Sequence, residues 1–197
     1  QNKSKAETNL FTEPVIQEDS QFQSVGKNDY FILEPGYQLI LEGKEGKDFT
    51  RLVITVLNDT KRIGNIETRI VEENESVNGN TVEISRNYFA FSKLTSSIYY
   101  FGEEVDNYKE GKIVNHDGAW IAEGINKPGI AMPGLILLGA RYYQEIAPKV
   151  AMDRAEIIST NETFNTPVGK FTNVLKTEET TPLEPLTKEY KLYAPGI

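Results

Sequence analysis

Cysteine is absent from this 197-residue chain, and histidine occurs once, at His116. Without cysteine the chain can form no disulfide within itself, no thiolate metal site and no cysteine nucleophile. Catalytic zinc normally takes at least two His or Cys ligands, so a single histidine also argues against zinc chemistry. We expect the hydrophobic core alone to stabilise the fold.

Long apolar runs and catalytic fingerprints are also missing. No stretch approaches the roughly 18 apolar residues of a membrane-spanning helix, so we expect no membrane span. The G-x-S-x-G elbow, the P-loop and the dinucleotide fingerprint do not occur. The chain starts at Gln1 without a basic-then-apolar leader, which favours a mature or trimmed chain whose leader, with or without a lipid anchor, has been removed.

Positive charge is scarce relative to negative charge, and the formal net charge is -8. An acidic surface repels phosphate backbones, and the basic residues are scattered rather than gathered in a stripe, so we expect no nucleic-acid partner. The hydrophobic fraction of 39% and the charged fraction of 25% are those of an ordinary globular protein. The chain should therefore fold around a core of normal size.

The residue composition and hydrophobic patterning divide the chain into two regions. Residues 1–28 mix acids and amides with isolated apolar pairs, which predicts a tether or a loosely docked arm. Residues 29–197 alternate short apolar runs with Gly, Asn and Pro, which predicts a single antiparallel β domain. The expected strands are Tyr37–Glu42, Phe49–Leu57, Glu67–Glu73, Thr81–Phe91, Ile98–Glu103, Lys112–Ala122, Arg141–Ile146, Ala151–Ser159, Phe171–Thr177 and Glu189–Tyr193.

The turns between these strands favour sequential hairpins. Asn78-Gly79 is the strongest hairpin signal, because this dipeptide suits the positive φ angles of a tight turn. Ala151–Ser159 would also suit a short amphipathic helix. The expected fold class is all-β with at most one short helix, in which a curved antiparallel meander forms a barrel or half-barrel; a sandwich stays open.

Acidic residues are densest between Glu103 and Glu110. Calcium takes oxygen ligands from flexible loops, so Glu103, Asp106 and Glu110 are candidate Ca²⁺ ligands, although their spacing is not that of an EF-hand. The alternative is a solvated acidic hairpin that protects a sheet edge. The His116-Asp117 pair is typical of a polar turn.

Two further sets of carboxylates lie on neighbouring candidate strands. The first set is Glu145, Asp153 and Glu156, and the second is Glu178, Glu179 and Glu184. Carboxylates that converge in a cleft could perform the acid–base chemistry of a hydrolase or lyase. Salt-bridged or exposed strand faces are the alternative, and the sequence does not decide between them.

Aromatic and apolar residues offer a ligand site. Adjacent aromatics on a strand face opposite sides, so one of each pair could line a concavity or fill the core. In the apolar run 128–139 we expect an irregular loop at 128–134, since proline cannot donate to a ladder. This run could form a lid, the mouth of a carrier cavity or a partner contact, and the alternative, which we favour, is that Leu135–Leu138 is a buried segment. The candidate ligand-binding residues are Tyr100, Trp120, Met132, Leu135, Tyr142 and Tyr193.

Four short segments carry a resemblance. They are Tyr100-Phe101-Gly102-Glu103, Gly139-x-x-Tyr142-x-Gln144-Glu145, Thr181-Pro182-Leu183-Glu184-Pro185 and Tyr193-Ala194-Pro195-Gly196. Through them the chain resembles an uncharacterised family of predicted secreted or lipoprotein-type β-rich proteins from environmental bacteria and archaea. That family has no established activity. The resemblance implies an extracytoplasmic location, which is periplasmic, at the cell surface or secreted.

Taken together, these features favour a non-enzymatic extracytoplasmic binding or structural domain. Its expected partner is a small apolar molecule in a curved-sheet cavity, or another envelope protein. The first alternative is a calcium-binding envelope protein with Ca²⁺ as its cofactor. The second alternative is a carboxylate-dependent hydrolase or lyase.

Overall fold

The structure, a computed structural model, describes residues 11–15 and 17–197; the first ten residues of the predicted arm lie outside the described residues. The regular structure in these ranges is β, apart from a single 3-10 turn, η1 (Asp19–Gln21). The all-β fold class is therefore confirmed, without the optional helix. No helix in the described part of the chain is long and apolar enough to cross a membrane.

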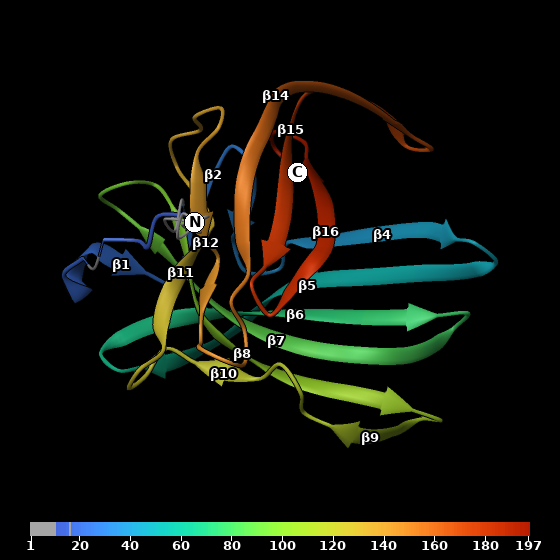
Figure 1. Cartoon of the computed structure of the whole chain (residues 1–197), viewed down its shortest axis with the longest axis horizontal. Coiled ribbons are helices and arrows are strands. Elements are labelled where there is room, and N and C mark those ends of the chain that lie inside the picture. The colour runs from blue at the N-terminus through green and yellow to red at the C-terminus, as the bar shows by residue number, and fades with distance from the viewer. Residues whose placement is uncertain (1–10, 16) are drawn as a thin grey trace, which may run out of the picture.

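The main sheet is antiparallel and contains ten strands. These are β1 (Phe22–Gln23), β4 (Gln38–Glu45), β5 (Asp48–Ile63), β6 (Ile66–Val77), β7 (Asn80–Ser92), β8 (Ile98–Lys109), β9 (Lys112–Asn115), β10 (Trp120–Ile121), β11 (Lys127–Met132) and β13 (Glu145–Ile146). Their central order is β13-β11-β8-β7-β6-β5-β4, so consecutive strands from β4 to β8 are neighbours in a meander. The sheet curls into a half-barrel (Figure 1).

Local chemistry fixes the turns and the curl. Asn78 and Gly79 both have positive φ angles, 52° and 81°, as a tight hairpin between β6 and β7 requires. The ladder of β5 shifts register between Val56 and Thr60. Arg69, which is 6% exposed, donates from Nη1 to Asn58 O at 2.6 Å and from Nε to Ser24 O at 3.0 Å. Its guanidinium thereby satisfies the Asn58 carbonyl within the bulge and ties the bulge to Ser24, which follows β1.

Two smaller sheets complete the fold. One joins β2 (Gly26–Asn28) to β3 (Phe31–Leu33), and the other has the order β12-β14-β15-β16. The strands of the second are β12 (Arg141–Tyr143), β14 (Arg154–Thr166), β15 (Gly169–Thr181) and β16 (Glu184–Tyr193). In Figure 1 they run across the long strands β4–β8. Val71 and Phe89 of the main sheet share one core cluster with Ile157 and Leu175 of the four-stranded sheet, so this sheet covers part of the inner face.

The outer face of the main sheet carries its own cluster. Tyr99 and Phe101 belong to it, whereas Tyr100 belongs to the inner cluster, as the alternation of side chains along a strand predicts. Phe22 of β1 packs on this outer cluster. Thr12 exchanges backbone hydrogen bonds with Arg141 and Tyr143. The described part of the predicted arm is thus docked on the sheets.

Four expectations were wrong in detail. Residues 128–132 belong to strand β11 rather than to an irregular loop. Pro128 is the second residue of β11 and pairs with Glu145 of the short strand β13, so it lies near the start of the strand, where a proline is tolerated. Leu135 and Leu138 are 71% and 68% exposed, not buried, because the chain has left the ladder there. Two predicted strands are each divided: Lys112–Ala122 by a turn between β9 and β10, and Arg141–Ile146 into β12 and β13, which belong to different sheets.

Candidate functional site

A cavity of about 580 Å³ lies between the main sheet and the four-stranded sheet. One side of it is apolar: Phe31 of β3, Leu39 and Leu41 of β4, and Leu52 and Ile54 of β5 line it. These residues share a face because Leu39 pairs with Ile54 and Leu41 pairs with Leu52 across the β4–β5 ladder. The edge of the half-barrel therefore contributes a continuous apolar wall.

The other side of the cavity is acidic. Its charged lining residues are Glu73 of β6, Glu103 of β8, Glu145 of β13, Asp153 before β14, Glu179 of β15 and Lys191 of β16. Direct partners in antiparallel strands share a face, and Glu73 pairs with the cavity residues Ile54 and Ser85. The carbonyl of Asp153 accepts the amides of Gln144 and Glu145 at 2.8 and 3.1 Å, which places its loop beside β13.

One carboxylate of this group is well partnered. Lys191 Nζ lies 2.8 Å from Glu179 Oε2, and Glu179 Oε1 accepts hydrogen bonds from Gln144 Nε2 at 3.2 Å and Thr177 Oγ1 at 3.2 Å. The remaining four carboxylates form no ion pair with any residue that the structure describes. These are Glu73, Glu103, Glu145 and Asp153. When they are ionised, these four carboxylates give the acidic side more negative charge than Lys191 can balance.

Burial shifts the protonation of these carboxyls. Burial raises the pKa of Glu145 to about 8, and repulsion from Glu103 and Asp153 adds to the rise. Burial likewise raises the pKa of Glu103 to about 7, against the opposing effect of the Tyr100 hydroxyl. The pKa of Glu73 is also raised, chiefly by burial. Near neutral pH the cavity therefore holds protons that a counter-charge could displace.

Lys191 keeps its charge in this setting. Burial opposes the ammonium form, but Tyr193 and Glu179 outweigh burial and hold the pKa of Lys191 above its ordinary value. The side chain is 54% accessible and lines the cavity. Burial also raises the pKa of the Asp153 carboxyl, and Lys191 opposes that rise.

Several polar groups at the acidic side lack partners. Glu145 and Gln144 are each only 9% exposed. The Oε1 atom of Gln144 is buried and accepts no hydrogen bond, and its orientation is fixed because Nε2 donates to Glu179. Trp120 Nε1 lies near Glu145, where it opposes the rise in pKa, yet it makes no hydrogen bond of normal geometry. Buried acceptors without donors are costly, so they mark a place where a donor would be stabilised.

The structure divides the predicted ligand-binding residues. Tyr100 and Tyr193 line the cavity. Trp120, Met132 and Tyr142 instead belong to the buried inner core, and exposed Leu135 lies outside the cavity lining. The apolar wall of this cavity is formed by β4 and β5, and Ala131 is the one residue of the 128–138 segment that lines it.

The predicted calcium ligands are spread along β8 and its turn. Glu103 faces the cavity, Asp106 forms an ion pair with Arg86 at 3.1 Å and lies 3.0 Å from His116 Nδ1, and Glu110 lies exposed at the following turn. No group of three or more His, Asp or Glu side chains in residues 11–15 and 17–197 is arranged to hold a metal ion. The calcium site therefore stays a prediction.

The other two carboxylate sets converge only in part. Glu145 and Asp153 meet in the cavity, joined by Glu179 from the second set. Glu156 pairs with Arg141 at 2.8 Å and Glu178 with Lys188 at 2.8 Å, and neither lines the cavity. Glu184 lines a polar pocket of about 310 Å³ that shares Asp153, Glu179 and Lys191 with the cavity.

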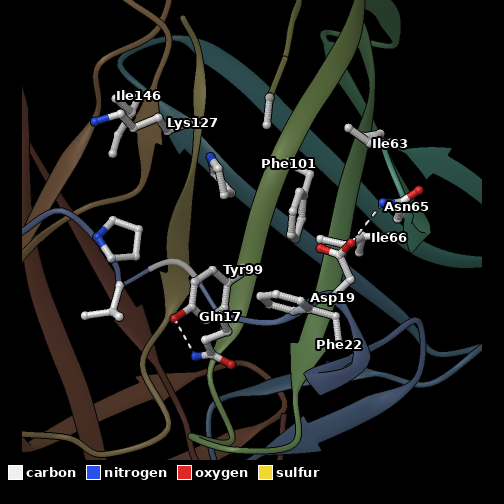
Figure 2. A pocket seen from close by; sticks show the side chains of 15 residues that line it. Gln17, Asp19, Phe22, Ile63, Asn65, Ile66, Tyr99, Phe101, Lys127 and Ile146 are labelled. Carbon is white, nitrogen blue, oxygen red and sulfur yellow. Dashed lines mark hydrogen bonds between the residues drawn. The ribbon is translucent and has the colours of Figure 1, made fainter. Parts of the chain in front are cut away.

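A separate pocket of about 300 Å³ lies on the outer face, between the main sheet and the N-terminal segment (Figure 2). Phe22, Tyr99 and Phe101 give it an apolar lining. Its polar groups satisfy one another: Gln17 Nε2 donates to Tyr99 Oη at 2.8 Å, and Asn65 Nδ2 donates to an Asp19 carboxylate oxygen at 3.0 Å. We therefore place the candidate site in the inner cavity, where buried polar groups have no hydrogen-bond partner.

Sequence reasoning did not select several of the residues that build the site. Glu73, Lys191 and the leucines of β4 were not singled out, because their common face depends on which strands pair and in what register. The available signal was that Glu73 lies two residues after Val71 and therefore on the same face of the strand. No family model matches the chain, and neither a curated protein nor a solved structure does so.

Proposed function

We propose that this chain is a non-enzymatic binding domain that holds a small molecule with an apolar body in the cavity of the half-barrel. The observation that carries the proposal is the apolar wall of β4 and β5 facing a space of about 580 Å³. That volume lies within the roughly 300–1,000 Å³ typical of small-molecule sites. Apolar lining with a few convergent polar groups is also the usual composition of such sites.

Two neighbouring residues of β4 provide a matched test. Leu41 lines the cavity, whereas Ile40 faces the opposite side of the same strand, and their exposed fractions are nearly equal at 48% and 47%. N-phenyl-1-naphthylamine, an uncharged apolar probe whose fluorescence rises in apolar surroundings, serves as the ligand. Leu41→Ser should weaken binding about fivefold. The ligand would bury the part of the Leu41 side chain that is still exposed, and this burial contributes about 1 kcal/mol to binding. Ile40→Ser should leave it unchanged.

The proposal fails if the native protein does not bind the probe, or if the two serine variants weaken binding equally. Equal effects would place the probe on the outer surface of the sheet. Circular dichroism and the fluorescence of buried Trp120 verify that both variants are folded. The extracytoplasmic location, and a partner from the envelope, stay predictions.

Carboxylate-dependent hydrolysis or elimination is the second candidate, favoured by the convergence of Glu103, Glu145 and Asp153 in one cavity. A carboxyl with a pKa of about 8 is protonated at neutral pH and suits a general acid. Release of p-nitrophenol from a panel of p-nitrophenyl glycosides by the native protein, lost in Glu145→Gln, would support this candidate. Rates equal to the uncatalysed reaction would count against it.

A further inference from the structure

The apolar and acidic sides of the cavity are distributed over different strands. The apolar side lies on β3, β4 and β5, and the acidic side lies on β6, β8 and β13, with Asp153 beside them. A ligand that fills the cavity with its apolar body must place one end against carboxylates. The chemistry of those carboxylates therefore selects the head group of the ligand.

A second, independent feature indicates what kind of head group fits. Glu145 is nine-tenths buried, lines the cavity and has no ion-pair partner among the described residues. Its neighbour Gln144 leaves Oε1 buried without a donor. Gln144 Oε1 is an acceptor, the Glu145 carboxyl becomes one when it loses its proton, and Lys191 is already held by Glu179 at 2.8 Å. What this side of the cavity lacks is a positively charged donor.

We infer that the ligand is an amphipathic cation, a protonated primary amine on an apolar chain or ring, whose ammonium group lies against Glu145 and is attracted by the nearby Glu103 and Asp153. This inference rests on the proposed function of the cavity. An ammonium group has three N–H donors and no acceptor, so it can serve several carboxylates at once. An anionic head would meet repulsion, and a neutral hydroxyl would supply one donor and leave the charge unbalanced.

Glu145 is surrounded by titratable groups from every element that faces it. These are Glu73 of β6, Tyr100 and Glu103 of β8, Asp153 before β14, Glu179 of β15, and Lys191 and Tyr193 of β16. The surroundings contain one cation against several acids. Binding of an ammonium group should displace the proton that Glu145 holds near neutral pH, so the assays are best run at about pH 8, where Glu103 is mostly ionised.

Three ligands with the same ten-carbon chain test the inference: decylammonium, decanol and decanoate. Each is titrated against the protein loaded with N-phenyl-1-naphthylamine, and affinity is read from displacement of the probe. Decylammonium should bind about tenfold more tightly than decanol, in keeping with a hydrogen bond to a charged acceptor. Decanoate should bind most weakly.

Glu103 and Glu104 are adjacent in β8 and face opposite sides of the sheet, so variants at these positions show whether the preference for decylammonium arises in the cavity. Glu103→Gln combined with Glu145→Gln should abolish the preference for decylammonium and leave decanol binding intact. Glu104→Gln, on the opposite face where Glu104 pairs with Lys61 at 2.5 Å, should keep the preference. Both proteins are first verified to be folded by circular dichroism.

The outcomes separate the two proposals. Equal binding of decylammonium and decanol, or tighter binding of decanoate, would overturn the cationic ligand and leave the apolar cavity standing. A preference that survives the double variant would overturn it as well, because the selecting charge would lie elsewhere. Failure of the probe and of all three ligands to bind would overturn the proposed function itself, and the inference with it.

Discussion

Glu145→Gln should make the protein less sensitive to alkaline pH. The folded state holds the Glu145 proton up to about pH 8, whereas the unfolded chain releases it near the ordinary pKa of 4.5. A raised carboxyl pKa means that the folded state binds more protons, so stability is fully present below pH 4.5 and is lost as pH rises through about 8. Glutamine, which resembles the protonated acid, removes this loss.

The magnitude follows from the interval between the two pKa values. Between about pH 5.5 and about pH 8, the native protein should lose about 3 kcal/mol through this one group. The free energy of unfolding of Glu145→Gln should therefore rise relative to the native protein by about that amount over the same interval. The single tryptophan, Trp120, is 4% exposed, so urea unfolding followed by its fluorescence reports the loss of the core.

Glu104→Gln is the control on the opposite face of β8. The hydrogen bond from Lys61 lowers the pKa of Glu104. The contribution of Glu104 to the free energy of unfolding is therefore lost only as the pH falls below the ordinary pKa of a glutamate, and it stays constant above about pH 5.5. This exposed pair should be worth about 1 kcal/mol or less. Parallel curves for native protein and Glu145→Gln would refute the reasoning, since they would mean that Glu145 titrates normally in the fold.

Two predictions concern the frame of the cavity, and both are measured by urea unfolding. Gly129→Ala should cost about 1–3 kcal/mol, because a Cβ there would overlap the carbonyl of Gln144 across the β11–β13 ladder; Gly43→Ala, where nothing lies nearby, should change stability by no more than about 0.5 kcal/mol. Arg69→Met should cost about 2–4 kcal/mol, since carbonyls of the β5 bulge lose their donor. Arg69→Met should also make β1 more susceptible to limited proteolysis. An unchanged free energy of unfolding would contradict this prediction, because it would show that water replaces the guanidinium without cost.

The order of the strands was largely predictable, because hairpin signals are local. Asn78-Gly79 marks a turn wherever the flanking strands go, and alternation along β8 correctly separates Tyr99 from Tyr100. Composition and pattern therefore define an antiparallel meander. They do not define where its inner face is covered, because the four-stranded sheet is placed by packing between residues distant in sequence.

The candidate site was predictable only in fragments. Glu103, Glu145 and Tyr100 were selected from the sequence, but for three different sites, and the structure places them in one cavity. Their convergence depends on the register of β7 with β8 and on the pairing of β11 with the two-residue β13. A shift of one residue would turn Glu103 to the other face. Hydrophobicity alone also gave a wrong prediction of burial for Leu135–Leu138, because the leucines of this segment are exposed.

The most direct test of the whole account is a crystal structure of the protein with saturating decylammonium. We expect electron density for the decyl chain along Leu39 and Leu41, with the nitrogen within hydrogen-bond distance of Glu145. Density for the ligand at another surface, or a cavity filled with ordered water at saturating ligand, would contradict it.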